Sequence, residues 1–197
     1  MTSPARNADA TRQRLLRAAL ELYTSVGFRA ATTPMIAERA GVAEGTIYRH
    51  FGGKEELLNE AYRGAQRWAT ALVSELQGDR PPGTAEFLRR LGRRIVEGAD
   101  RDPAAVRMVL HCREERYLDD RSHETAREFR AALQQVVAAG KSDGVIRPGP
   151  AELWASIWLA MVGFAAERVS SREWPLDHPQ LGLTLEAAWD AIAARRG

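Results

Sequence analysis

The sequence has little cysteine and no long apolar run, and each absence excludes a class of protein. Cys112 is the single cysteine among 197 residues, so an internal disulfide framework and a CxxC metal site are excluded. We expect its thiol to be a small buried apolar group, with a redox sensor as the alternative. No apolar stretch approaches about 18 residues, and residues 1–10 are polar. The sequence therefore predicts a cytoplasmic protein without a secretory signal or a membrane contact.

Motifs of the common enzyme classes are also missing. Lys54 is not part of a P-loop, because Tyr48 occupies the position of the first glycine and Glu55 that of the Ser or Thr. His111 and Glu115 lie four residues apart but outside any HExxH pattern, and no GxSxG elbow occurs. The sequence therefore predicts no catalytic residue, no metal site and no cofactor.

Alternating strand patterns, internal repeats and low-complexity segments are missing as well. Helical patterns instead alternate with proline and glycine, which mark nearly every junction. Beyond residue 53 the predicted helices span 54–76, 84–99, 103–113, 122–139, 150–170 and 182–194. The chain is therefore predicted to be all-α, and 45% hydrophobic content suffices for one sizeable core with a small domain appended.

Residues 32–51, TTPMIAERAGVAEGTIYRHF, predict two short helices joined by a tight turn. We expect Thr33 to cap the first helix with its hydroxyl, while Pro34 occupies the first helical position, where its missing N–H costs nothing. This helix is predicted to end near Ala40, and Gly41 supplies the left-handed residue that stops it. Apolar contacts are expected from Ile36, Ala37, Ala40, Val42, Ile47 and Phe51. The outer residues of the second helix can then enter the major groove of DNA.

An amphipathic segment precedes this pair. Its apolar stripe consists of Leu15, Ala19, Leu22 and Val26. These steps of four, three and four residues predict a helix that braces the other two. Phe28, after the break at Gly27, is expected to close a small three-helix core.

A helix-turn-helix that ends in GTIYRHF and is followed by GGKEELL closely resembles the TetR family of bacterial transcriptional regulators. The resemblance covers roughly residues 11–62 and depends on the joint occurrence of Gly41, Thr46, Tyr48, Phe51, Lys54 and Leu57. It implies an all-α protein with a DNA-binding domain at 9–55 and a larger helical domain for effector binding and dimerisation at 56–197. It also implies a homodimer that binds a palindromic operator in double-stranded DNA and is released by a small-molecule effector. Repression is favoured over activation, since most such proteins repress.

The resemblance assigns DNA contacts to Thr33, Pro34, Ala43, Glu44, Gly45, Thr46, Tyr48, Arg49, His50 and Lys54. Thr33, Tyr48 and Lys54 would hold phosphates, whereas residues 43–46 would approach base edges. For Tyr48 a half-buried aromatic is the alternative. For His50 packing is an equally good interpretation.

Two positions depart from the family pattern. Ala43 stands where Ser or Thr is usual, which removes a cap worth about 1 kcal/mol, and Gly53 replaces a capping Ser or Asp. The carboxylate of Glu44, in the first turn of the second helix, interacts favourably with the helix dipole but would be repelled by DNA phosphates. If it faces the bases, it can accept a hydrogen bond from cytosine N4. Gly45 permits close approach, and Thr46 can offer its hydroxyl to a base or its methyl group to thymine.

The distribution of charge agrees with a DNA contact near the N-terminus. Residues 1–50 carry seven Arg or Lys against four Asp or Glu, a net of +3, whereas residues 51–197 carry 21 against 22. An excess of this size is modest, so we expect affinity to come from two copies on one duplex. An ordinary solvated basic surface is the alternative interpretation.

The helix predicted at 150–170 has two apolar sides. One side consists of Trp154, Ile157, Trp158, Met161, Val162 and Ala165, and the other of Leu153, Ala160 and Phe164. The last helix offers Leu181, Leu185, Trp189 and Ile192. A helix in a small monomer needs only one buried stripe, so these helices are expected to pack against a second subunit, as the resemblance also implies. Burial of both sides within one chain is the alternative.

The resemblance further implies an effector pocket among the middle helices. Candidates to line it are Trp68, Phe87, Met108, His111, Cys112, Phe129, Trp154, Trp158 and Met161. Plain core packing is the alternative for each of them. His111 is a titratable group able to orient a polar ligand atom, and the tryptophans favour an apolar or aromatic compound. An all-helical enzyme or metal-dependent bundle protein, and an interaction scaffold, remain as other functions for the whole chain.

Overall fold

The structure is a computed structural model that describes residues 4–79, 83–112 and 115–194. These residues form α1 (Pro4–Ser25), α2 (Thr33–Ala40), α3 (Gly45–His50), α4 (Lys54–Gly78), α5 (Thr84–Arg101), α6 (Pro103–His111), a 3-10 turn η1 (Glu115–Tyr117), α7 (Asp120–Ser142), α8 (Ala151–Ser170) and α9 (Pro179–Asp190). No strand occurs in the described ranges, so the all-α prediction is confirmed. Among the described helices, none combines the length and apolar character that a bilayer crossing requires.

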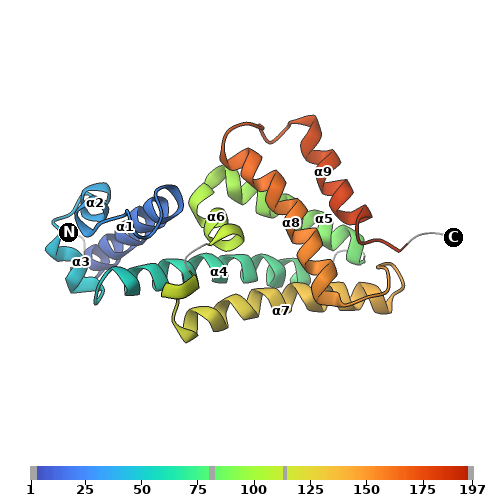
Figure 1. The fold of residues 1–197 in the computed structure, drawn as a ribbon, viewed down its shortest axis with the longest axis horizontal. Helices are drawn as coiled ribbons and strands as arrows, with labels where there is room; N and C mark the ends of the chain where they lie inside the picture. Colours follow the sequence, from blue (N-terminus) through green and yellow to red (C-terminus); the bar gives the residue numbers. More distant parts are fainter. Residues whose placement is uncertain (1–3, 80–82, 113–114, 195–197) are drawn as a thin grey trace.

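A small bundle of α1, α2 and α3 lies at one end of the molecule, at the left of Figure 1. Helix α4 runs from this bundle along the length of the molecule, with α7 packed beside it. Helix α5 packs on the far part of α4, α8 packs against α5 and α7, and α9 packs against α5 and α8. The short α6 lies between these helices and the bundle (Figure 1). Helix α4 therefore connects the bundle mechanically to the rest of the molecule.

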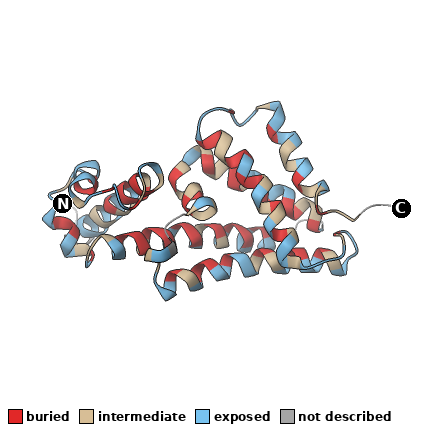
Figure 2. Ribbon diagram, in the orientation of Figure 1, coloured by how far each residue is buried: buried red, intermediate tan, exposed pale blue. Residues whose placement is uncertain are grey.

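Two groups of buried apolar side chains hold these parts together, as the red stretches of Figure 2 indicate. The first group joins α1, α2 and α3 to the N-terminal half of α4, and it includes Ala104 and Met108 of α6 and Ala126 of α7. The second group joins the C-terminal half of α4 to α5, α7, α8 and α9. Because the first group draws on helices of the larger part, the division between residues 55 and 56 stays a prediction.

The apolar stripe of α1 is shorter than predicted. Leu15, Ala19 and Leu22 are buried, but Val26 is 48% exposed. The helix ends at Ser25, so Val26 lies beyond its last turn and no longer follows the helical period. Phe28 is buried and packs against Tyr23 at 5.4 Å between ring centroids, which confirms that it closes the small core.

The last helix lies earlier in the sequence than the predicted span 182–194. The ring of His178 caps it by accepting from the N–H of Gln180, and Pro179 follows at the start of the helix. Beyond α9 the chain runs beside the α7–α8 connection, where the N–H of Arg147 donates to Ile192 O at 3.0 Å. A tertiary contact therefore replaces the last helical turn that the apolar pattern had predicted.

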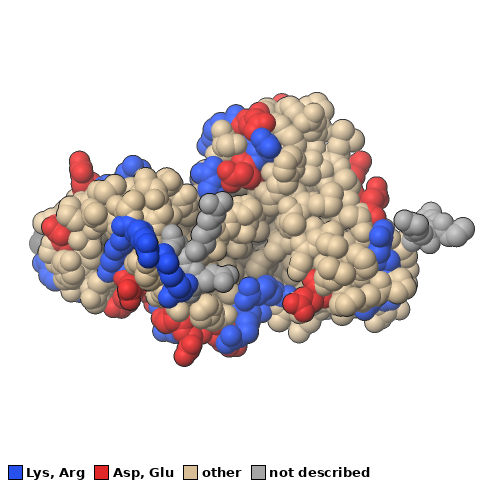
Figure 3. Space-filling model, viewed as in Figure 1, with Lys and Arg blue, Asp and Glu red and all other residues tan. Residues whose placement is uncertain are grey.

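Helices α8 and α9 keep an apolar surface in the single chain. Leu153 and Phe164 of α8 are 47% and 48% exposed, and Leu183 of α9 is 64% exposed. Four apolar residues of the last segment were expected to face a second subunit. They instead pack on the core of their own chain: Leu181, Leu185, Trp189 and Ile192. The exposed side of α9 thus carries Leu183, and the area over α8 and α9 is mostly uncharged in Figure 3.

Candidate DNA-binding surface

The start of α2 differs by one residue from the prediction. Thr32 is the capping residue, and its Oγ1 accepts from the N–H of Met35 at 3.4 Å. Thr33 is the first helical residue, and its hydroxyl donates to Glu44 Oε1 at 2.8 Å. Pro34 thus occupies the second helical position, which tolerates a missing N–H because the first four N–H groups of a helix lack partners within it.

The turn between α2 and α3 is closed as predicted. Gly41 adopts φ of 65°, a left-handed conformation that a side chain disfavours, and its N–H donates to Glu38 O at 3.0 Å. The N–H of Val42 donates to Ala37 O at 3.0 Å. These bonds fix the direction in which the chain enters α3.

Packing on the inner side of α3 fixes its rotation. Ile47 and Phe51 are 0% and 3% exposed, and the guanidinium of Arg12 lies 5.0 Å from the centre of the Phe51 ring. The buried residues of α2 are Ile36, Ala37 and Ala40. Because both inner faces are locked, the outer face of α3 is presented in one orientation.

The outer face collects most of the predicted DNA contacts. Ala43, Glu44, Gly45 and Arg49 are exposed, His50 is half-buried, and Tyr48 is 57% exposed. Thr46 differs from the expectation, because its side chain is buried and its hydroxyl accepts from Arg49 Nη2 at 3.0 Å. Thr46 is therefore placed to orient Arg49 rather than to face outward.

Lys54 lies beside this face at the start of α4. Its ammonium group lies 4.2 Å from the centre of the Phe28 ring, and Nζ donates to Arg29 O at 3.4 Å. Gly53 precedes the helix without a side-chain cap, as predicted, and the carboxylate of Glu56 accepts instead from the N–H of Gly52. The amine is thus positioned by the small core while it stays at the positive end of a helix dipole.

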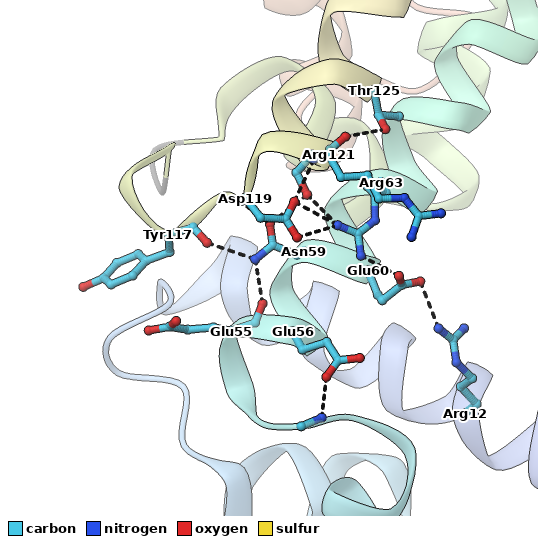
Figure 4. A network of polar contacts seen from close by, with 12 residues as sticks. Arg12, Glu55, Glu56, Asn59, Glu60, Arg63, Tyr117, Asp119, Arg121 and Thr125 are labelled. Carbon is cyan, nitrogen blue, oxygen red and sulfur yellow. Dashed lines mark hydrogen bonds and ion pairs between the residues drawn. The ribbon is translucent and has the colours of Figure 1, made fainter.

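A buried polar network ties this bundle to the rest of the chain (Figure 4). Asn59 of α4 donates from Nδ2 to Tyr117 O at 2.9 Å, and its Oδ1 accepts from the N–H of Asp119 at 2.8 Å and from the hydroxyl of Ser122 at 2.7 Å. Asn59 thus holds both η1 and the start of α7 against α4. Tyr117 also packs its ring 4.3 Å from that of Phe28, which extends the contact into the bundle.

Arg63, one turn further along α4, continues the network. Its Nη1 donates to both carboxylate oxygens of Asp119 at 3.0 Å, and its Nη2 donates to Glu60, which also accepts from Arg12 of α1 at 2.9 Å. The hydrogen bond from Arg63 holds the pKa of Glu60 below its ordinary value. Burial raises the pKa of Asp119, but hydrogen bonds from Ser122 and Arg63 outweigh burial and hold this pKa below its ordinary value. The result is a continuous path from α1 through α4 to α7.

Sequence reasoning did not single out this network. Its signal was the presence of Asn59, Arg63 and Gln66 on the side of α4 that otherwise carries buried apolar residues. Polar side chains on a buried face require partners, which distinguishes such positions from ordinary surface residues.

The structure does not bring the candidate pocket residues together. Trp68 lines a cleft of about 670 Å³ between α1, α4, α5 and α6, which we call the junction cleft. A second cleft, of about 880 Å³, is lined by Met108, His111 and Cys112 opposite the end of α1. Met161 lines a groove between α8 and α9.

The other candidates are accounted for by packing within the chain. Phe87, Phe129 and Trp158 are 6%, 3% and 1% exposed and belong to the second apolar group. The indole N–H of Trp154 donates to Pro148 O at 3.2 Å, and the guanidinium of Arg147 lies over its ring. Plain core packing, the alternative named for these residues, therefore describes Phe87, Phe129 and Trp158, while Trp154 packs half-buried against the same group.

Comparison with known proteins gives a consistent assignment. The family model described as "Bacterial regulatory proteins, tetR family" matches residues 15–61. The regulator TcmR of Streptomyces glaucescens is 30% identical over an alignment that covers 92% of this chain and 82% of TcmR. The regulator SrpR of Pseudomonas putida is 32% identical over 49% of this chain, and the match spans about half, 51%, of SrpR.

A solved structure extends the likeness to the whole fold. A TetR family transcription regulator from Marinobacter aquaeolei VT8 superposes with a TM-score of 0.80 at 22% identity, covering 97% of this chain and 100% of the other. At this identity the superposition concerns the fold alone. It nevertheless covers the α1–α3 bundle together with the helices beyond it.

Proposed function

The chain belongs to the TetR family of bacterial regulatory proteins, and we propose on this premise that it regulates transcription by placing α3 in the major groove of DNA. The observation that carries the proposal is the two-sided character of α3. Ile47 and Phe51 anchor its inner side, while Glu44, Tyr48 and Arg49 project from its outer side. As a member of a family of transcriptional regulators, the protein is a regulator and not an enzyme.

We assign the DNA contacts to the exposed and half-buried residues of this surface. Tyr48 and Lys54 would hold phosphates, and Ala43, Glu44 and Gly45 would approach base edges. The remaining contributors would be Thr33, Pro34, Arg49 and His50, with Thr46 positioning Arg49. Residues 9–55 would form the DNA-binding domain, and residues 56–197 the domain for effector binding and dimerisation.

The exposed apolar side of α8 and α9 supports a homodimer. Leu153, Phe164 and Leu183 would be covered by the same helices of a second copy in a two-fold arrangement. A two-fold protein reads a two-fold site, so the operator would be an inverted repeat with half-sites about one helical turn apart or somewhat more. The protein would act in the cytoplasm, where it would repress by occupying promoter DNA until a small-molecule effector displaces it.

Selection of bound sequences from a random pool of duplex DNA tests this function. The wild-type chain is expected to enrich an inverted repeat, and a mobility shift with the DNA flanking its own gene should follow. The Tyr48→Ala variant, processed in parallel, should enrich the same repeat more weakly. Enrichment of no palindrome, or binding that does not depend on base order, would contradict the proposal and favour a scaffold.

A further inference from the structure

The junction cleft is built from both parts of the molecule. Leu16 and Leu20 of α1 form one wall, Ala61 and Trp68 of α4 form the floor, and Val106 of α6 lies opposite. Its volume of about 670 Å³ is within the range of sites that bind small organic molecules. The cleft is therefore large enough for a compound of several rings, and one of its walls belongs to the helix that braces α2 and α3.

Two glycines shape the floor of the cleft. A Cβ atom added at Gly64 would meet no atom within 4 Å beyond its own helix, so space remains open at this point of α4. A Cβ atom added at Gly98 would lie 2.5 Å from the indole of Trp68. The absence of a side chain at Gly98 thus lets α5 pack directly against the Trp68 ring in the floor of the cleft.

The charges at the rim are already paired within the protein. Arg94 donates to Glu75 at 2.7 Å, and Arg17 donates to Glu21 at 3.2 Å. Arg101 lies 3.7 Å from Glu97. A charged ligand would have to compete with these partners, whereas a neutral one would not.

The interior of the larger part offers little room for a ligand around Phe87, Phe129 and Trp158, the buried residues first considered for an effector pocket. Phe87, Phe129 and Trp158 are almost completely buried among the side chains of the second apolar group. A ligand at these positions would have to displace close-packed side chains. The junction cleft needs no such displacement.

We propose that the junction cleft binds a neutral, ring-bearing apolar compound against Trp68. Because α1 forms one wall and α4, α5 and α6 form the others, an occupant stabilises one spacing of α1 from α4. If the proposed function holds, the spacing of α1 from α4 sets the positions of the two α3 helices of the dimer, and hence the affinity for DNA. Only this regulatory consequence, and not the binding itself, rests on the proposed function.

Substitution of Gly64 provides the direct test. Gly64→Leu places a side chain in the open part of the cleft, and Gly64→Ala places a single methyl group there. Both replacements favour the helix, because glycine is the weaker helix former. Gly78→Leu is the matched control, since Gly78 ends the same helix, has equally open surroundings and does not line the cleft.

Fluorescence titration of the full-length chain with N-phenyl-1-naphthylamine, a neutral three-ring probe, gives the readout. We expect saturable binding by the wild type and by Gly78→Leu, affinity at least about tenfold lower for Gly64→Leu, and an intermediate value for Gly64→Ala. The anionic analogue 8-anilinonaphthalene-1-sulfonate should bind more weakly to the Gly64-sensitive site. Equal affinity of all variants for the neutral probe, no saturable binding, or tighter binding of the sulfonate would overturn the proposal.

This titration contains no DNA, so its failure is distinguishable from failure of the proposed function. The regulatory consequence is tested separately by adding the neutral probe to the mobility shift. The probe should weaken DNA binding by the wild type and by Gly78→Leu, but not by Gly64→Leu. Equal weakening of all three would contradict the link between the cleft and α3.

Discussion

The hydroxyl of Thr33 donates a hydrogen bond to the carboxylate of Glu44, with 2.8 Å between Oγ1 and Oε1. This bond joins the first residue of α2 to the residue that precedes α3. It orients the Glu44 side chain within the surface proposed to meet DNA, and it engages an oxygen that phosphates would otherwise repel. The two neighbouring threonines therefore have different roles, which substitution can separate.

Thr32→Val should lower the free energy of unfolding by about 1 kcal/mol, because it removes the side-chain cap of α2. Thr33→Val should change stability by less than about 0.5 kcal/mol, because Thr33 is half-buried outside the core and does not cap the helix. It should nevertheless weaken DNA binding several-fold, since Glu44 loses its partner. Urea unfolding and DNA titration at fixed salt measure the two effects. Equal loss of stability in both variants would show that the roles are not separate.

Tyr48→Ala should weaken binding to all DNA sequences by roughly tenfold per copy, the effect of losing one hydrogen bond to a charged group, and by roughly a hundredfold for the proposed dimer. Because tyrosine is uncharged, the slope of log DNA affinity against log salt should stay unchanged in this variant. Lys54→Ala should instead reduce the slope of log affinity against log salt by about 1 per copy, hence by about 2 for the proposed dimer. It should also lower stability, because the ammonium packs on Phe28. Val145→Ala, at a residue 40% exposed in the α7–α8 connection, is the control and should change neither property.

Asn59→Ala should lower the free energy of unfolding by about 3 kcal/mol, because the buried hydroxyl of Ser122 and two part-buried backbone groups lose their hydrogen bonds to Asn59. These backbone groups belong to Tyr117 and Asp119. Urea unfolding provides the measurement, and Ser74→Ala, on an exposed face of the same helix, is the control. A loss no larger than that of the control would mean that water replaces the network at little cost.

The pKa of Glu60 makes stability depend on pH. Since the hydrogen bond from Arg63 lowers this pKa below 4.5 in the folded chain, the contribution is fully present above about pH 4.5 and is lost as pH falls through the lowered value. Unfolding measured between about pH 3 and 6 should show this decline in the wild type and a shallower one in Glu60→Gln. Parallel curves of unfolding free energy against pH for the wild type and Glu60→Gln would show that Glu60 does not cause the decline.

Leu183→Glu should convert the proposed dimer into a monomer, because it places a charge in an apolar surface that a second copy would cover. Light scattering at micromolar concentration should give 21.8 kDa for this variant and twice that mass for the wild type. Val145→Glu, at an exposed apolar residue of the α7–α8 connection, should remain dimeric. A monomeric wild type would contradict the two-fold arrangement, whatever the variant does.

Local chemistry made the helix-turn-helix predictable. Gly41 follows a short apolar-periodic segment, and few residues other than glycine adopt the left-handed conformation that closes the turn. The burial of Ile47 and Phe51 follows from the period of a helix. The position of the cap was less certain, because Thr32 and Thr33 both precede Pro34, and a contact with Glu44, eleven residues away, distinguishes them.

Contacts between distant segments were not predictable. Asn59 and Ser122 are 63 residues apart, and no local pattern states that they meet. The same holds for the apolar residues of the middle helices, since the space left beside Trp68 depends on how four helices pack. The end of α9 was misplaced for a related reason, because the pairing of Arg147 with Ile192 ends the helix.

Helix α4 contains 25 residues without a proline and forms one continuous rod about 37 Å long. A tilt of only about 5° about its far end would displace Lys54 by about 3 Å, close to the rise of one base pair along DNA. Under the proposed function, a ligand or a partner subunit would need to alter the angle of this rod only slightly to put α3 out of register with its groove. The rigidity of one uninterrupted helix converts a small rotation among packed side chains into a displacement that a DNA site can detect.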